Sequence, residues 1–228
     1  MTGVPKVSAP KPAAPGKQAA LGESSFQASL LDDAAQIGLR DLDRARRTDL
    51  GQGAWIELLR SWVSGADELF ALLIGAVGWR EERRRMYDRV VDVPRLLSHY
   101  GEGEPLPHPV LEQARDALTA RYEPGLGEPL STAGFCLYRD GRDSVAWHGD
   151  TSGRRVSETI VAIVSLGTPR SLLLRPAGGG PALRHDVGHG DLLVMGGSCQ
   201  RTWQHSIPKT ARTAGPRISV QFRPSGVH

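Results

Sequence analysis

Cysteine is scarce in this sequence: 228 residues include only Cys136 and Cys199. Two thiols cannot form a disulfide scaffold or a metal site of four cysteines, and so few cysteines favour a reducing, intracellular compartment. No stretch approaches the roughly 18 consecutive apolar residues that a membrane-spanning helix needs. The N-terminus also lacks the apolar segment of a secretory signal. We therefore expect a cytoplasmic protein that makes no membrane contact.

Apolar residues make up 39% of the chain, which is enough for a core but below the usual share. The length fits one domain with a tail. Residues 1–25 contain four prolines among Ala, Lys, Gly and Ser. Such a segment cannot bury apolar area, so we expect a disordered tail.

The net charge of +3 hides an uneven distribution. Residues 26–130 hold 13 basic and 18 acidic side chains, whereas residues 131–228 hold 12 basic and 6 acidic ones. A polyanion would therefore meet the second half of the chain. Because 24 of the 28 cations are arginine, the base composition of the genome explains the bias equally well.

Before residue 131 the pattern mixes strand and helix. Residues 54–63 favour a strand, and a helix is expected at about 65–77, opened by a capping box of Ser64 and Asp67. Its inward side chains should be Leu69, Leu72, Leu73 and Val77. A charged, Arg-rich stretch covers 80–100, and a second helix begins at Pro109.

After residue 131 the chain becomes a series of short apolar runs punctuated by Gly, Pro and Asp. Seven or eight short strands without helical periodicity indicate an antiparallel sandwich or barrel. The runs cover residues 132–138, 159–166, 171–175, 181–187, 191–195, 202–207 and 217–223.

His148, Gly149 and Asp150 follow the first of these runs. Positions i and i+2 of an extended chain point to the same side, so an imidazole and a carboxylate could converge on one metal ion. An isolated pair of this kind is more often an ordinary surface contact. Trp147 should point the other way, into the core.

The last run alternates strictly. Arg217, Ser219, Gln221 and Arg223 share one face, and the intervening residues are apolar. Two long arginine side chains on one face could close around a small dicarboxylate, because guanidinium groups bind carboxylates in a bidentate manner. Without further context, an exposed edge strand with two solvated arginines explains the pattern as well.

A third metal ligand has four candidates downstream: His185, His189, His205 and His228. His205 lies in a strand-like segment just before the arginine strand, whereas His185 and His189 lie in a Gly-rich turn. Two histidines and one carboxylate on a small barrel are typical of non-haem Fe(II) oxygenases, which leave metal positions open for cosubstrate and oxygen.

Taken in order, these motifs resemble the AlkB family of 2-oxoglutarate- and Fe(II)-dependent dioxygenases. The motifs are Tyr138, His148-Gly-Asp150, Gly190-Asp191, Trp203-Gln-His205 and Arg217-Ile-Ser-Val-Gln-Phe-Arg223, and a Val-Pro-Arg segment at 93–95 is similar to bacterial members. The resemblance implies a mainly β fold with flanking helices, a double-stranded β-helix or jelly roll. It implies a single domain at 26–228, with an extension and nucleotide-recognition lid at about 54–130 and the core at about 131–224.

The resemblance also implies roles for residues. His148, Asp150 and His205 would be the catalytic iron ligands. Tyr138, Arg217 and Arg223 would surround 2-oxoglutarate, with Arg217 at its distal carboxylate and Arg223 at the carboxylate beside the iron. Cys136, Ser219 and Gln221 stand where the family pattern has Asn, Asn and Thr, and they should also line the cosubstrate site.

For the substrate, the resemblance implies oxidative demethylation of alkylated bases in DNA before RNA, using Fe(II), 2-oxoglutarate and O2. Tyr87 and Met86 would stack on a base that has been flipped out of the duplex, and Arg95 and Ser152 would contact it. We expect a bacterial monomer that acts on nucleoid DNA. The alternatives are the same chemistry on a protein or small molecule, and a non-catalytic jelly roll that binds nucleic acid.

Overall fold

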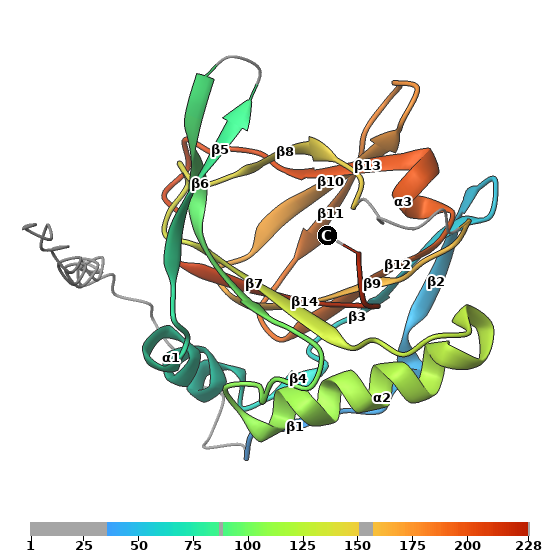
Figure 1. The fold of residues 1–228 in the computed structure, drawn as a ribbon, viewed down its shortest axis with the longest axis horizontal. Coiled ribbons are helices and arrows are strands. Elements are labelled where there is room, and N and C mark those ends of the chain that lie inside the picture. Colours follow the sequence, from blue (N-terminus) through green and yellow to red (C-terminus); the bar gives the residue numbers. More distant parts are fainter. Residues whose placement is uncertain (1–35, 87–88, 151–156, 228) are drawn as a thin grey trace, which may run out of the picture.

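A computed structural model of the chain describes residues 36–86, 89–150 and 157–227. The tail expected at 1–25 lies outside these residues. Two antiparallel sheets face each other and form the predicted jelly roll, with helices on its outer side (Figure 1). No helix in the described part of the chain is long and apolar enough to cross a bilayer.

The large sheet has eight strands and the small sheet has four. In spatial order, the large sheet contains β2 (Arg46–Gly51), β3 (Ala54–Leu59), β12 (Asp191–Gly197), β9 (Val161–Gly167), β14 (Arg217–Arg223), β7 (Thr132–Tyr138), β6 (Arg89–Tyr100) and β5 (Arg80–Met86). The small sheet contains β11 (Leu183–Val187), β10 (Arg170–Pro176), β13 (Trp203–Ile207) and β8 (Val145–His148). A short pair, β1 (Gly38–Leu39) and β4 (Val63–Ser64), stands apart from both sheets.

The central strands of the large sheet bury both of their faces. On β14, Ile218, Val220 and Phe222 join a core cluster under the helices, whereas Arg217 and Ser219 face the space between the sheets. Period-2 alternation thus separates an apolar face from a polar one within a single buried strand. The polar face of β14 is where the functional site is built.

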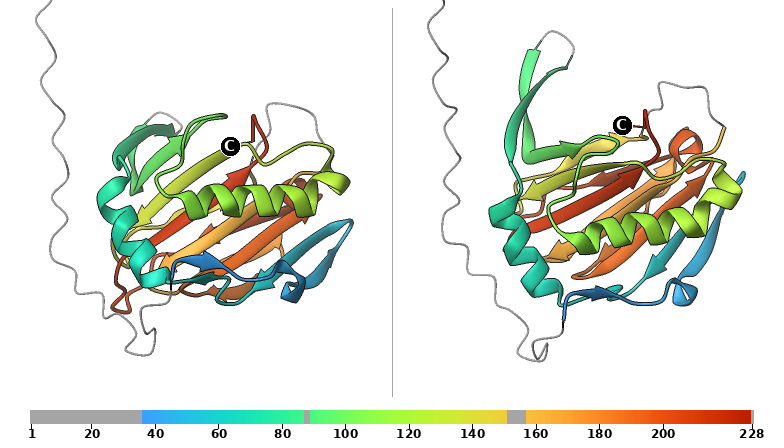
Figure 2. Two further views of the ribbon diagram at one scale, coloured as in Figure 1. Left: turned by 90° about the horizontal axis from the view of Figure 1, so that it is seen from below. Right: turned by 60° about the horizontal axis from the view of Figure 1, so that its bottom comes forward.

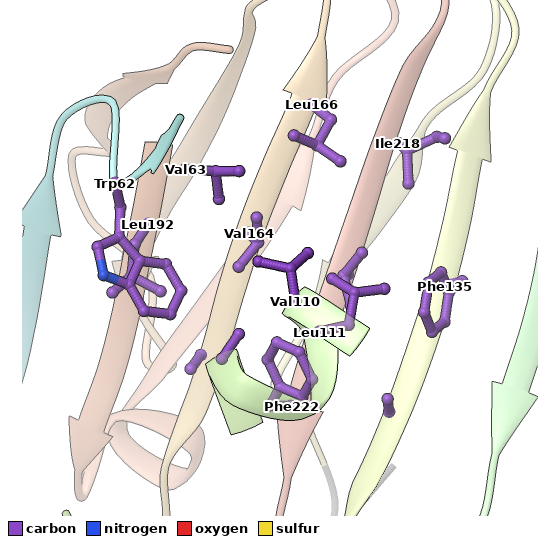
Figure 3. Close-up of a cluster of buried hydrophobic side chains, with 14 of the residues drawn as sticks. Trp62, Val63, Val110, Leu111, Phe135, Val164, Leu166, Leu192, Ile218 and Phe222 are labelled. Carbon is purple, nitrogen blue, oxygen red and sulfur yellow. The ribbon is translucent and has the colours of Figure 1, made fainter. Parts of the chain in front are cut away.

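The outer apolar face is covered by two helices, α1 (Ala66–Ala76) and α2 (Pro109–Leu126) (Figure 2). α2 begins as predicted: Nδ1 of His108 accepts a hydrogen bond from the Val110 amide, and Pro109 occupies the first turn. Figure 3 shows Val110 and Leu111 lying over the strands in one cluster with Phe222. Replacing such a buried leucine by alanine typically costs about 2–5 kcal/mol, so this layer anchors the large sheet.

The helix expected at 65–77 is present, but two details of the prediction are wrong. Gly65 caps α1 in a left-handed conformation (φ 60°) without a side-chain hydrogen bond, so Ser64 forms no capping box. Leu72 is 45% exposed, because the buried face of α1 carries Phe70 instead. The chain then enters an antiparallel hairpin of β5 and β6, which rises above the barrel (Figure 1).

Two further short helices complete the described structure. They are η1 (Leu42–Arg44) and α3 (Cys199–Thr202). α3 connects the last residues of β12 with the start of β13, and it therefore lies next to the strand that carries His205.

Candidate metal centre

Three side chains from two segments converge between the sheets. His148 ends β8, Asp150 follows two residues later, and His205 lies on β13 directly opposite His148 in the strand register. The candidate ligand atoms of the three residues all lie within 4.8 Å of one another. The two imidazole rings are 4.2 Å apart between centroids. The strand pairing of β8 with β13 therefore creates the cluster.

Each of the two histidines offers a ring nitrogen to a metal. Nδ1 of His148 lies 2.9 Å from the carbonyl oxygen of Ala146, which makes Nδ1 the donor and leaves Nε2 free to coordinate. Burial lowers the pKa of His205 to about 4, and the opposing charge of Asp150 does not compensate. The imidazole of His205 is therefore neutral at neutral pH and can act as a ligand.

Asp150 supplies the negative charge of the cluster. Burial alone would raise its pKa, but the guanidinium of Arg223 and the contact with His148 outweigh burial and hold the pKa well below its usual range. The carboxylate is therefore ionised although Asp150 is only 5% exposed. Two imidazoles and one carboxylate form the donor set that suits Fe(II) and keeps coordination positions open, so the residues present fit this metal.

A cavity of about 60 Å³ adjoins the cluster, and the guanidinium of a buried arginine, Arg217, lines it. Arg217 is 1% exposed, and its Nε donates a hydrogen bond to Oγ of Ser165 at 2.9 Å. Its Nη1 is buried without a hydrogen-bond partner among the described residues. A buried guanidinium with an unused donor is costly unless an anion binds to it. This end of the cavity therefore suits a carboxylate.

Tyr138 lies beside this guanidinium. Cζ of Arg217 is 5.1 Å from the centre of the tyrosine ring. Burial raises the pKa of Tyr138 to about 12, so its hydroxyl stays protonated and remains a hydrogen-bond donor. Arg217 and Tyr138 are register partners on β14 and β7, and hence the strand pairing holds them together.

Three further polar groups line the cavity where the sequence departs from the family pattern. Sγ of Cys136 lies 3.7 Å from Oε1 of Gln221. Nε2 of Gln221 donates to the carbonyl oxygen of Ser219 at 3.0 Å and also to Oγ of Ser219. A Cβ at Gly134 would lie only 2.8 Å from Nη1 of Arg223, so a residue without a side chain makes room for that arginine.

Arg95 lies in this cavity. Its Nη1 donates to the carbonyl oxygen of Ser144 at 3.0 Å, and its guanidinium lies beside the Cys136 thiol. Because β6 carries Arg95, the cavity is bordered by the strand that leads into the β5–β6 hairpin.

The other residues named in the sequence analysis either lie outside the described part of the structure or are found away from the predicted position. Met86 is the last residue of β5, but its side chain lies outside the described part of the structure, as do Tyr87 and Ser152. His189 is held elsewhere, because its Nδ1 accepts from the Gly167 amide at 2.7 Å. Trp147 is not in the core as expected: it is half-buried, with the guanidinium of Arg175 stacked 4.2 Å from its ring.

A second cavity, of about 830 Å³, lies away from the metal ligands, between the β5–β6 hairpin and residues 139–143. Charged side chains that line it form ion pairs with one another. Arg83 pairs with Asp92 at 2.8 Å, and Arg142 pairs with Asp140 at 2.7 Å.

Two residues that bind side or main chains of the site were not identified from the sequence. Ser165 could have been found, because it is the one hydroxyl side chain in the apolar segment of β9. No sequence pattern indicated Gln200, because its contact is with a residue 50 positions away: its Oε1 accepts a hydrogen bond from the Asp150 amide at 3.0 Å.

Comparison with known proteins supports the same chemistry. Residues 67–223 match the model of a family described as the 2OG-Fe(II) oxygenase superfamily. The chain is 32% identical over 181 residues to human alpha-ketoglutarate-dependent dioxygenase alkB homolog 3, covering 71% of this chain and 62% of that protein. It is 28% identical over 184 residues to human DNA oxidative demethylase ALKBH2, covering 69% of this chain and 68% of that protein.

The bovine alkB homolog 3 is 31% identical over 188 residues and is covered to 64% of its length, against 72% of this chain. The chain thus spans somewhat under two thirds of the alkB homolog 3 proteins. The solved structure of OsALKBH1 has a TM-score of 0.52 at 18% identity, covering 78% of this chain and 100% of that one. That structural likeness concerns the fold.

Proposed function

Because the chain belongs to the 2OG-Fe(II) oxygenase superfamily and is AlkB-like within it, we propose that it demethylates alkylated bases in DNA, and secondarily in RNA. The proposed reaction consumes 2-oxoglutarate and O2 and releases succinate, CO2 and formaldehyde. The observation that carries the proposal is the cluster of His148, Asp150 and His205 next to a buried arginine with an unused donor. When bound, Fe(II) supplies the activation of O2 that is coupled to decarboxylation of 2-oxoglutarate.

In this proposal, the three ligand side chains hold Fe(II) from one side, and the cavity beside them holds the cosubstrate. Arg217, at the buried end, binds the distal carboxylate with its free Nη1, and the Tyr138 hydroxyl adds a second donor. Arg223 binds near the other carboxylate while it keeps Asp150 ionised. Cys136 and Ser219 also line the cavity.

The methylated base enters next to the β5–β6 hairpin. A base within a duplex cannot reach a metal buried between two sheets, so it must be flipped out or single-stranded. Methylation at N1 of adenine or N3 of cytosine blocks pairing and lowers the cost of flipping. We assign stacking to Tyr87 and Met86, and contacts with the base to Arg95 and Ser152. The name of human ALKBH2, a DNA oxidative demethylase, supports this class of substrate.

We further propose that residues 26–228 form one domain, in which 54–130 provide the extension and lid. We also propose that the protein is a cytoplasmic monomer that acts on nucleoid DNA.

The test is turnover of a methylated oligonucleotide by the purified protein with Fe(II), 2-oxoglutarate and ascorbate. We expect stoichiometric succinate and formaldehyde, and no formaldehyde from the same oligonucleotide without the methyl group. His205→Ala should abolish both products, because it removes a ligand. Full activity of this variant would contradict the ligand assignment, and succinate without formaldehyde would point to a protein or small-molecule substrate.

A further inference from the structure

We propose that Gln200 is a positioning residue that sets the orientation of Asp150 toward the metal. The inference rests on the proposed function, since it concerns the same metal centre. Oε1 of Gln200 accepts a hydrogen bond from the backbone amide of Asp150 at 3.0 Å, and both residues are buried, at 8% and 5% exposure. The amide can only donate, so the side-chain oxygen of Gln200 must face it.

Asp150 needs such a partner because the sheet no longer holds its backbone. β8 ends at His148, so the amide of Asp150 lies beyond the strand ladder. A buried backbone N–H requires an acceptor, and Gln200 provides it across 50 residues of chain. The direction of the Asp150 carboxylate depends on this backbone, because the side chain has only two rotatable bonds.

The helix α3 brings Gln200 into place and touches the ligand segment a second time. A Cβ on Gly149 would lie 2.4 Å from the carbonyl oxygen of Gln200, so the two backbones are in close contact. α3 itself is fixed from the other side, because Oγ of Ser198 donates to the carbonyl oxygen of Gln52 at 2.7 Å. Three residues after α3 ends, the chain reaches His205. One short turn thus fixes the segments of all three metal ligands.

The second polar atom of Gln200 argues against a purely structural role. Its Nε2 is buried without a hydrogen-bond partner among the described residues. A buried donor that lacks a partner is destabilising, so packing alone would favour an apolar side chain of the same length. The amide at this position is therefore explained by the bond that its oxygen makes with Asp150.

The test is binding of Co(II) to the metal-free full chain, followed by visible absorbance, because this readout does not depend on turnover. Gln200→Met keeps the length of the side chain and removes the acceptor, and Gln200→Glu keeps an acceptor oxygen. Arg201→Ala is the matched control, because Arg201 lies on the same turn but donates to the carbonyl oxygen of Ser157 instead. Circular dichroism verifies that each variant is folded.

We expect Gln200→Met to weaken Co(II) binding roughly 10- to 100-fold, the usual effect of losing a partner of a metal ligand. Gln200→Glu should restore binding toward the wild-type value, and Arg201→Ala should not change it. If the methionine variant is unfolded, Gln200→Asn, which withdraws the acceptor by one methylene, takes its place with the same expected loss.

Two results would overturn the proposed role of Gln200, and only one of them would also overturn the metal centre. If the wild-type chain binds Co(II) and Gln200→Met binds it equally well, the positioning role is wrong but the metal centre stands. If the wild-type chain itself does not bind Co(II), the proposed function fails and the role of Gln200 fails with it.

Discussion

Arg223 donates a hydrogen bond from Nε to Oδ2 of Asp150 at 2.9 Å, and this pair is largely shielded from solvent, with side-chain exposures of 16% and 2%. The other carboxylate oxygen, Oδ1, lies 3.5 Å from Nε2 of His148. One oxygen of Asp150 therefore faces the metal position and the other faces the arginine. Arg223 connects the metal centre with the cosubstrate cavity, which it also lines.

Because of this link, replacing Arg223 and replacing Arg217 should affect ligand binding differently. Arg223→Ala should weaken both Co(II) binding and 2-oxoglutarate binding, because it removes a partner of Asp150 as well as a cation. Arg217→Ala should weaken 2-oxoglutarate binding alone. A hydrogen bond to a charged group contributes about 1.5–3 kcal/mol, so each variant should raise the KM for 2-oxoglutarate roughly 10- to 100-fold.

The measurements are a Co(II) titration and the dependence of succinate formation on 2-oxoglutarate. Arg142→Ala is the control, because the side chain of Arg142 is 90% exposed and binds Asp140 outside the cavity. Wild-type Co(II) affinity in Arg223→Ala would show that Asp150 does not depend on this arginine.

Gly149→Ala tests the close contact between the ligand segment and α3. The added Cβ would lie 2.4 Å from the carbonyl oxygen of Gln200, and backbone must shift to accept it. Overpacking of this kind costs about 1–3 kcal/mol, so urea unfolding should show a lower free energy of unfolding. Gly178→Ala is the matched control, because nothing lies within 4 Å of a Cβ there. Equal stability of the two variants would contradict the contact.

The arginine strand was predictable from the sequence because its geometry is local. Alternation with period 2 places Arg217 and Arg223 on one face of β14 whatever the rest of the chain does. The same logic places His148 and Asp150 on one side of an extended segment. The position of His205 in a neighbouring strand-like run favoured it among four candidate histidines, and the resemblance to the AlkB family implied it as the third ligand.

What could not be predicted depends on contacts between distant segments. The bond from Asp150 to Gln200 joins the segment after β8 to a four-residue helix, and neither segment has a periodicity that would indicate it. Trp147 should have been in the core by alternation from His148. The pairing of β8 with β13 shifts register between Val145 and His148, and Trp147 is half-buried, with the guanidinium of Arg175 stacked on its ring.

The two cysteines should react at very different rates. Cys199 is 2% exposed, and burial, together with the charge of Asp150, raises its thiol pKa to about 12. At pH 8 this group is a protonated, shielded thiol, and the thiolate is the reactive form. Cys136 instead lines the cavity. A thiol reagent should therefore label one cysteine in the folded protein and the second only after unfolding.

Bound 2-oxoglutarate should slow the labelling of Cys136, since it would occupy the same cavity. The experiment counts labelled thiols over time with the metal-loaded protein, with and without 2-oxoglutarate under anaerobic conditions. Cys136→Ser should show no labelling before unfolding. Labelling of Cys199 in the folded variant, or an unchanged rate with 2-oxoglutarate, would contradict the placement of the cosubstrate.

The salt dependence of turnover distinguishes a nucleic-acid substrate from a small one. Residues 131–228 hold 12 basic and 6 acidic side chains, so this half of the chain can bind phosphates. With about three phosphate contacts, a fourfold rise in salt concentration should lower affinity for a methylated duplex roughly 40-fold, because counterions are released on binding. The measurement is kcat/KM for formaldehyde release at 50 and 200 mM KCl. The matching methylated nucleoside, which has no phosphate, serves as the control and should respond little. If the oligonucleotide and the nucleoside respond alike, the enzyme does not bind the phosphate backbone, and the substrate must be sought among small molecules or proteins.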